Sequence, residues 1–134
     1  MQDDSRPMTI TKMLPRLPIE RTLGIISGRW KAVIIFVLLD GPKRTCEIET
    51  QIPGISQKVL IQQLKALEEH GLVWRTTFPD ETQRVDYRLT PLGLSLQPLI
   101  SLLQDWGQRH AEELGETHRL ISCDAVVRPL DGQR

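Results

Sequence analysis

Cysteine and aromatic residues are both scarce in this chain of 134 residues. The two cysteines, Cys46 and Cys123, are too few and too isolated to form a disulfide framework or a zinc cluster. A reducing cytoplasm is therefore the expected compartment. Aromatic residues make up 4% of the sequence, so aliphatic side chains must fill most of the core.

Long hydrophobic runs are also missing. The longest, AVIIFVLL at 32–39, has eight residues, whereas a helix that crosses a bilayer needs roughly 20. The N-terminus carries Asp3 and Asp4 and no apolar stretch, which argues against a signal peptide. These absences predict a soluble protein with no membrane partner.

Neither sign of charge is in excess, because 17 Lys and Arg balance 17 Asp and Glu. The segment 43–90 is balanced as well, with seven basic and seven acidic residues. Net charge therefore does not indicate nucleic-acid binding. Any such activity must depend on where the charged side chains point.

No residues are spaced as catalytic or metal-binding groups. His70, His110 and His118 do not pair with a cysteine, serine or acid at a useful spacing, and surface positions explain them better. No glycine-rich phosphate loop or metal motif occurs. We therefore expect no enzyme activity, no metal and no cofactor.

The periodic segments predict one domain flanked by two irregular stretches. Residues 1–16 contain Pro7 and Pro15 and are expected to form a flexible arm. Residues 17–114 contain all the periodic segments, and residues 115–134 are expected to form a loose tail.

Four helices are predicted in the first half of the domain. An amphipathic helix lies within 19–28, and the apolar segment 30–41 is expected to be a central buried helix. A short helix follows with Thr45 as its expected N-cap. A longer helix runs from an N-cap at Ser56 to a C-cap at Gly71.

The hydrophobic period then changes to that of strands. Residues 72–78 and 84–90 alternate between two faces, and a polar loop joins them, which predicts a β-hairpin. A last helix begins at Thr90-Pro91 and is expected to be kinked or split at Pro98. Its apolar stripe consists of Leu92, Leu96, Leu99, Leu103 and Trp106.

A short helix, a tight turn, a capped helix and a hairpin are together typical of a winged helix-turn-helix, here in a mainly α fold. In that fold the second helix enters the major groove of DNA. Lys58, Gln62 and Lys65 share one side of this helix, opposite Leu60 and Leu67. Lysine neutralises phosphate and glutamine pairs with adenine, but such a stripe alone also fits a plain solvated surface.

The other predicted contacts with double-stranded DNA flank this helix. Arg84, beside the hairpin tip, either contacts DNA or is simply solvated, while Asp80 and Glu81 at the tip are expected to repel phosphates. Lys43 and Arg44 either anchor the DNA backbone or cap the carbonyls of the preceding helix. The candidate DNA-binding residues are Ser56, Gln57, Lys58, Gln62, Lys65, Arg84, Lys43 and Arg44.

Five segments, within residues 18–107, carry a family resemblance. They are PIERTL (18–23), GRWKAVIIFVLLDGPKR (28–44), PGISQKVLIQQLKALEEHGLVWR (53–75), RVDYRLTPLG (84–93) and DWG (105–107). In these segments the chain resembles the HxlR family of bacterial transcriptional regulators, relatives of the MarR winged-helix proteins. The resemblance implies a homodimeric, DNA-binding repressor or activator, with the first and last helices in the dimer interface. The interface residues expected on this basis are Leu17, Ile19, Leu23, Leu92, Leu96, Leu99, Leu103 and Trp106.

Two positions depart from the family pattern. Members usually carry a cysteine before the proline of the PIER-like motif, in several of them a redox or electrophile sensor, whereas Leu17 cannot form a thiolate. Ile61 replaces a commonly small hydroxylated residue and is expected to pack under the wing rather than contact a thymine methyl group. Cys46 is expected to be a buried structural cysteine, and Cys123 has no evident partner.

We therefore expect a sequence-specific DNA-binding transcriptional regulator that acts as a homodimer. The junction between its DNA-binding core and its dimerisation helices leaves room for a small-molecule effector. The alternative is a winged-helix module that binds proteins and no longer DNA, which the neutral net charge and the acidic wing tip would favour.

Overall fold

The computed structural model describes residues 14–79 and 83–121, so most of the predicted arm and tail lie outside it. The fold is mainly α with one two-stranded antiparallel sheet, which confirms the predicted winged helix-turn-helix. The elements are α1 (Pro18–Ile26), α2 (Lys31–Leu38), α3 (Thr45–Gln51), α4 (Gln57–Glu69), β1 (Val73–Thr77), β2 (Val85–Leu89), α5 (Pro91–Leu94), α6 (Gln97–Glu113) and the 3-10 helix η3 (Thr117–Arg119).

The core lies between α2, α3, α4 and the base of the hairpin, and it is largely aliphatic. The central helix α2 buries residues on nearly every side, as its sequence predicts. Full burial of each such side chain stabilises the fold by roughly 1.5–3 kcal/mol. The side chains that are 0% exposed are Ile34, Ile35, Val37, Ile48, Leu60, Leu64 and Leu67.

Helix α4 begins at the predicted N-cap, whereas its C-cap is His70, one residue before the predicted Gly71. The Ser56 hydroxyl oxygen accepts a hydrogen bond from the Val59 N–H at 3.1 Å. Gly71 follows the helix with a φ of +80°, and the Leu72 N–H donates back to the Leu67 carbonyl at 3.0 Å. The left-handed glycine turns the chain from α4 directly into the hairpin.

The N-cap of α3 differs from the prediction. Thr45 is the first helical residue, and Arg44 is the N-cap. The Arg44 N–H donates to the Glu47 carboxylate at 2.8 Å, so an acidic side chain three residues later satisfies this donor. The prediction of Thr45 as the cap was therefore wrong by one residue.

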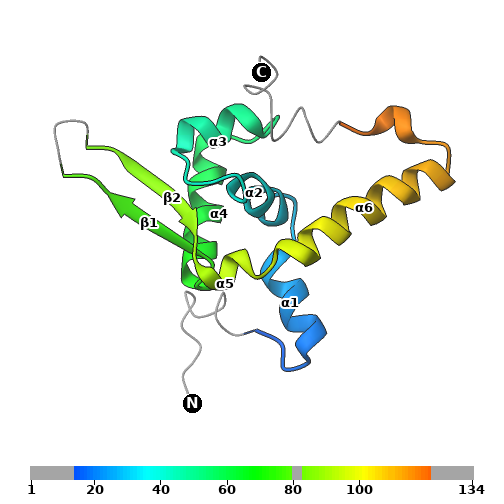
Figure 1. Cartoon of the computed structure of the whole chain (residues 1–134), viewed down its shortest axis with the longest axis horizontal. Helices are drawn as coiled ribbons and strands as arrows, with labels where there is room; N and C mark the ends of the chain where they lie inside the picture. The colour runs from blue at the N-terminus through cyan, green and yellow to red at the C-terminus, as the bar shows by residue number, and fades with distance from the viewer. Residues whose placement is uncertain (1–13, 80–82, 122–134) are drawn as a thin grey trace.

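The predicted hairpin is formed by β1 and β2, which pair antiparallel from Val73 with Leu89 to Thr77 with Val85. It projects from the helical bundle (Figure 1). The segment before α3 extends its edge, because Lys43 and Tyr87 exchange two backbone hydrogen bonds at 2.9 and 2.8 Å. The predicted acidic tip, Asp80 and Glu81, lies outside the described residues.

Thr90 fastens α5 to the end of α4. Its hydroxyl donates to the Gly71 carbonyl at 2.7 Å and accepts from the Gly93 N–H at 3.0 Å. Gly93 packs so closely that an added Cβ would stand 2.3 Å from the Leu72 carbonyl oxygen. The start of the last helical segment is thus fixed relative to the second helix of the helix-turn-helix.

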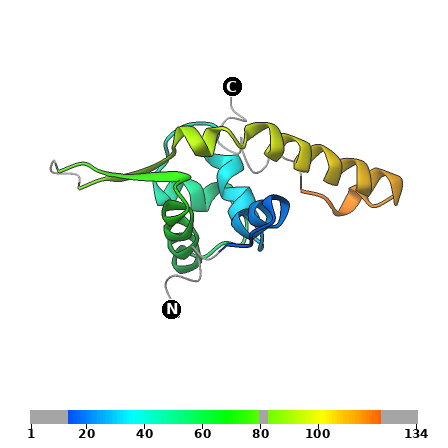
Figure 2. The same cartoon turned by 90° about the horizontal axis from the view of Figure 1, so that it is seen from below.

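The predicted last helix is split into α5 and α6, with Pro98 in the first turn of α6. Helix α6 contacts α2 and then extends away from the bundle on the side opposite the hairpin (Figures 1 and 2). Of its 17 residues, Ile100 and Ala111 are buried. Within 14–79 and 83–121, no helix is long and apolar enough to span a membrane.

Candidate nucleic-acid interface

Helix α4 separates its apolar and polar side chains cleanly. Leu60, Leu64 and Leu67 are fully buried against α2 and the hairpin base. The opposite side is exposed and carries the predicted polar stripe. The exposed residues of this side, together with the N-cap Ser56, are Ser56, Gln57, Lys58, Ile61, Gln62, Lys65 and Glu68. We call these seven residues the α4 face.

Charge on the α4 face is polarised along the helix. The first turn contains no acidic residue, whereas Glu68 and Glu69 lie in the last turn. No ion pair engages Lys58 or Lys65 among the described residues. Both ammonium groups are therefore available for phosphate or base contacts.

Ile61 lies on the α4 face and is 44% exposed. The prediction that it packs under the wing was therefore wrong. At about 100° per residue, position 61 lies about 40° from Lys65 and about 60° from both Lys58 and the buried Leu64, so it stands at the edge of the polar stripe. An exposed apolar side chain at the edge of this stripe suits contact with a thymine methyl group.

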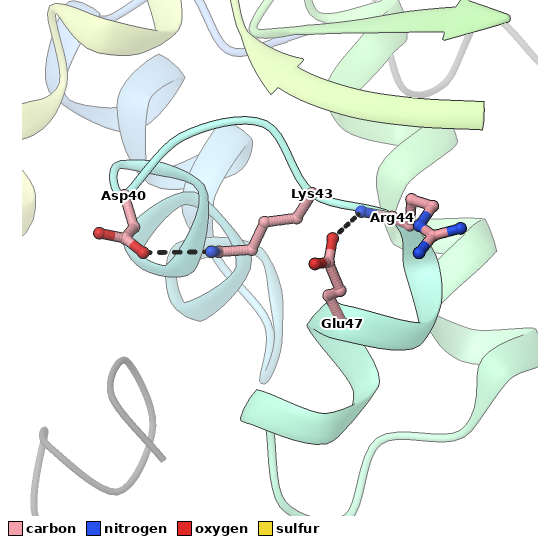
Figure 3. A network of polar contacts seen from close by, with 4 residues as sticks. All are labelled: Asp40, Lys43, Arg44 and Glu47. Carbon is pink, nitrogen blue, oxygen red and sulfur yellow. Dashed lines mark hydrogen bonds and ion pairs between the residues drawn. The ribbon is translucent and has the colours of Figure 1, made fainter. Parts of the chain in front are cut away.

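The two basic residues before α3 lie in different environments (Figure 3). The Lys43 ammonium is 3.2 Å from the Asp40 carboxylate, and its side chain is only 12% exposed. Lys43 therefore pairs with the Asp40 side chain rather than with the carbonyls at the end of α2. The spacing of three residues between Asp40 and Lys43 could have indicated this ion pair from the sequence. Arg44 is exposed, and its guanidinium points away from this pair.

The basic residue beside the wing tip is held by its neighbours. Arg84 Nε lies 3.3 Å from the Asp86 carboxylate, and the guanidinium lies 4.4 Å from the centroid of the Phe78 ring. Gln83, next to it, is exposed and has a φ of +49°. The Arg84 side chain is therefore held in place by Phe78 and paired with Asp86. Its contact with DNA stays a prediction.

A second exposed surface, the α1–α6 stripe, is apolar. Its predicted members Leu17, Ile19, Leu23, Leu92, Leu103 and Trp106 are exposed, whereas Leu96 and Leu99 are half-buried and pack against the core. Leu102, 64% exposed, belongs to the stripe but was missed by the sequence reasoning. Its spacing of four residues from Trp106 was the signal that could have found it.

The cysteine prediction needs correction. Cys46 is exposed, not buried, because it occupies the outer side of the first turn of α3 while Ile48 faces the core. Cys123 lies outside the described residues. Leu17, where the family resemblance led us to look for a cysteine, is 59% exposed and has no sulfur. Among the described residues, no cluster of His, Cys, Asp and Glu could hold a metal ion.

A capped helix with an exposed polar face, preceded by a short helix and followed by a hairpin, defines a winged helix-turn-helix DNA-binding protein. A family model described as an HxlR-like helix-turn-helix matches residues 25–114, and the chain belongs to this family. The protein is a DNA-binding transcriptional regulator and not an enzyme.

Relatives of known sequence and structure agree with this assignment. The HTH-type transcriptional regulator YkvN of Bacillus subtilis (strain 168) is 44% identical over 94 residues, which cover 70% of this chain and 80% of YkvN. YodB of the same strain is 40% identical over 100 residues, covering 75% and 88%. The solved structure of the redox regulator HypR in its reduced form has a TM-score of 0.69 at 35% identity, covering 73% of this chain and 97% of HypR. These relatives give no support to the alternative of a protein-interaction module.

Proposed function

We propose that the protein acts as a homodimer that recognises an operator sequence by inserting α4 into the major groove. The observation that carries this proposal is the α4 face, where Lys58, Gln62 and Lys65 are exposed opposite fully buried leucines. Gln62 is positioned to pair with a base edge, and the lysines to contact phosphate or guanine.

Residues at the edges of the α4 face complete the proposed DNA contacts. Ser56 and Gln57 lie at the N-terminal end of α4, which lies closest to the bases in this class of protein. Arg44 and Arg84 would bind the flanking backbone from α3 and the wing. Lys43 contributes less in this proposal, because its side chain is only 12% exposed and a phosphate would have to compete with Asp40 for the ammonium.

The homodimer is supported by the α1–α6 stripe. Trp106 is 65% exposed and Ile19 is 71% exposed, and several large apolar side chains left exposed on the first and last helices are typical of an interface rather than of solvated helices. A two-fold axis through this stripe would repeat the same contacts on both protomers. The cytoplasm is the compartment in which such a regulator meets DNA.

A small-molecule effector has a candidate cavity of 430 Å³. Arg21 and Ile25 of α1, His70 at the end of α4, and Leu92 and Leu96 are among its lining residues. Sites for small organic ligands commonly enclose about 300–1,000 Å³. An occupant would contact both the DNA-reading helix and the dimerisation helices, so it would bias their relative orientation.

Selection of bound sequences from a random DNA pool tests this proposal. We expect a two-fold symmetric site whose half-site centres are about 10 base pairs, or a multiple of that, apart. Recovery of no common sequence would contradict sequence-specific reading. Recovery of a single, unrepeated half-site would contradict the homodimer.

A further inference from the structure

Arg29, between α1 and α2, lies beside the turn that joins α3 to α4. A Cβ atom built on Gly54 in that turn would stand 3.8 Å from Arg29 Nη2 and 3.9 Å from Trp30 Cη2, which is van der Waals contact. Ser56, the N-cap of α4, follows Gly54 by two residues. A cation from outside the helix-turn-helix is thus placed next to the start of α4.

The Arg29 guanidinium rests on an aromatic ring. Its central carbon lies 4.3 Å from the centroid of the Trp30 ring, within the range of a cation–π contact. Trp30 is half-buried and packs against the hydrophobic core, so the ring itself is fixed. A guanidinium on a fixed ring loses less conformational freedom when it binds an anion than an unsupported one does.

Among the described residues, no acidic side chain pairs with Arg29. The residue is exposed, and no ion pair involves it within the part of the chain that the structure describes. The residues that follow the turn, Ser56, Gln57 and Lys58, are exposed as well, and none of them is acidic. Arg29, beside Gly54, and Lys58, four residues after Gly54, thus both carry positive charge near the α3–α4 turn of a protein whose net charge is zero.

We propose that Arg29 binds a phosphate of the DNA backbone at the edge of the groove that α4 enters. This inference rests on the proposed function. It adds a DNA contact from the segment between α1 and α2, which is outside both the helix-turn-helix and the wing. Guanidinium can donate two parallel N–H groups to phosphate oxygens. Because phosphate contacts carry no base information, Arg29 sets affinity and position rather than sequence preference.

The competing explanation is that the stack of Arg29 on Trp30 only stabilises the connection between α1 and α2. Two substitutions separate the explanations. Arg29→Gln keeps a polar side chain but removes the charge, and Arg29→Lys keeps the charge without the planar guanidinium. Arg119→Gln is the control for lost charge, since Arg119 is an exposed arginine in η3, at the far end of α6 from the bundle (Figure 1). Unlike Arg29, it pairs with an acidic residue, Glu116, at 3.5 Å.

The test measures affinity for a selected operator and for unrelated DNA over a range of salt concentrations. Arg29→Gln is expected to weaken binding to the operator and to unrelated DNA by about the same factor, roughly tenfold at ~0.15 M salt. The slope of log affinity against log salt should also fall by about 0.9 for each phosphate that is no longer neutralised. Arg29→Lys should keep most of the slope, and Arg119→Gln should match the wild type. Melting temperatures should fall by no more than a few degrees, which is the effect expected from losing one exposed cation–π contact.

Three outcomes would overturn the role of Arg29. Wild-type affinity and slope in Arg29→Gln, together with weakened binding in Lys58→Ala, would reject Arg29 while leaving the proposed function of α4 intact. Weakened binding with a lowered melting temperature and an unchanged salt slope would assign Arg29 to the fold. Wild-type binding in both Arg29→Gln and Lys58→Ala would reject the role of Arg29 and that of the α4 face together.

Discussion

Replacing both Lys58 and Lys65 by alanine is expected to lower operator affinity on the order of 100-fold at ~0.15 M salt and to flatten its salt dependence. Both ammonium groups are exposed, and neither has an ion-pair partner among the described residues. In a homodimer the double substitution would remove up to four cations from the two proposed interfaces. If each neutralises one phosphate, the slope of log affinity against log salt falls by about 3.6.

The matched control for this experiment is Arg109→Ala with Arg119→Ala. It removes the same number of exposed positive charges from α6 and η3, away from α4. The control protein should bind the operator with nearly wild-type affinity if location rather than total charge matters. Equal losses in the two variants would mean that binding depends on overall charge, and unchanged binding in the lysine variant would reject the α4 face.

Breaking the α1–α6 stripe is expected to have the second large effect. Glutamates at positions 102 and 106, through Leu102→Glu and Trp106→Glu, would place four charges in the proposed dimer interface. Both side chains are more than half exposed in the single chain, at 64% and 65%, so the protomer should still fold. The expected result is a monomer at micromolar concentration by light scattering, with operator affinity lower by about 10²–10⁴-fold because the second half-site no longer adds to binding.

Glutamates on the opposite side of α6 provide the control. Gln97→Glu with Ser101→Glu has the same spacing of four residues, and both positions are exposed. This protein should remain a dimer and bind the operator normally. A monomeric wild type, or a stripe variant that stays dimeric, would contradict the proposed interface.

Local features of this fold could be predicted from the sequence because their partners are close along the chain. The Ser56 hydroxyl caps an N–H three residues away, and Gly71 closes the last turn of α4. The alternating strands and the Thr90-Pro91 start of α5 were equally local. In each case a residue type with a known backbone preference, such as serine or threonine at an N-cap or glycine after a helix, stands where the chain has that conformation.

Features that depend on three-dimensional surroundings were harder to predict. Ile61 and Cys46 are apolar or commonly buried residue types, and only the packing of α3 and α4 shows that both face outward. Arg29 is 25 residues from Gly54 in the sequence, so nothing local indicates that they meet. The α1–α6 stripe was identified by period and resemblance, whereas the division into exposed and half-buried members required the structure.

The central claim is that the α4 face reads bases, and comparing the wild type with Gln62→Ala in the random-pool selection tests it most directly. A glutamine that pairs with adenine is worth about 1–3 kcal/mol of discrimination against the wrong base. We expect Gln62→Ala to lose base preference at one position in each half-site, while the remaining positions and the half-site spacing stay the same. An identical sequence preference in the two proteins would contradict the claim.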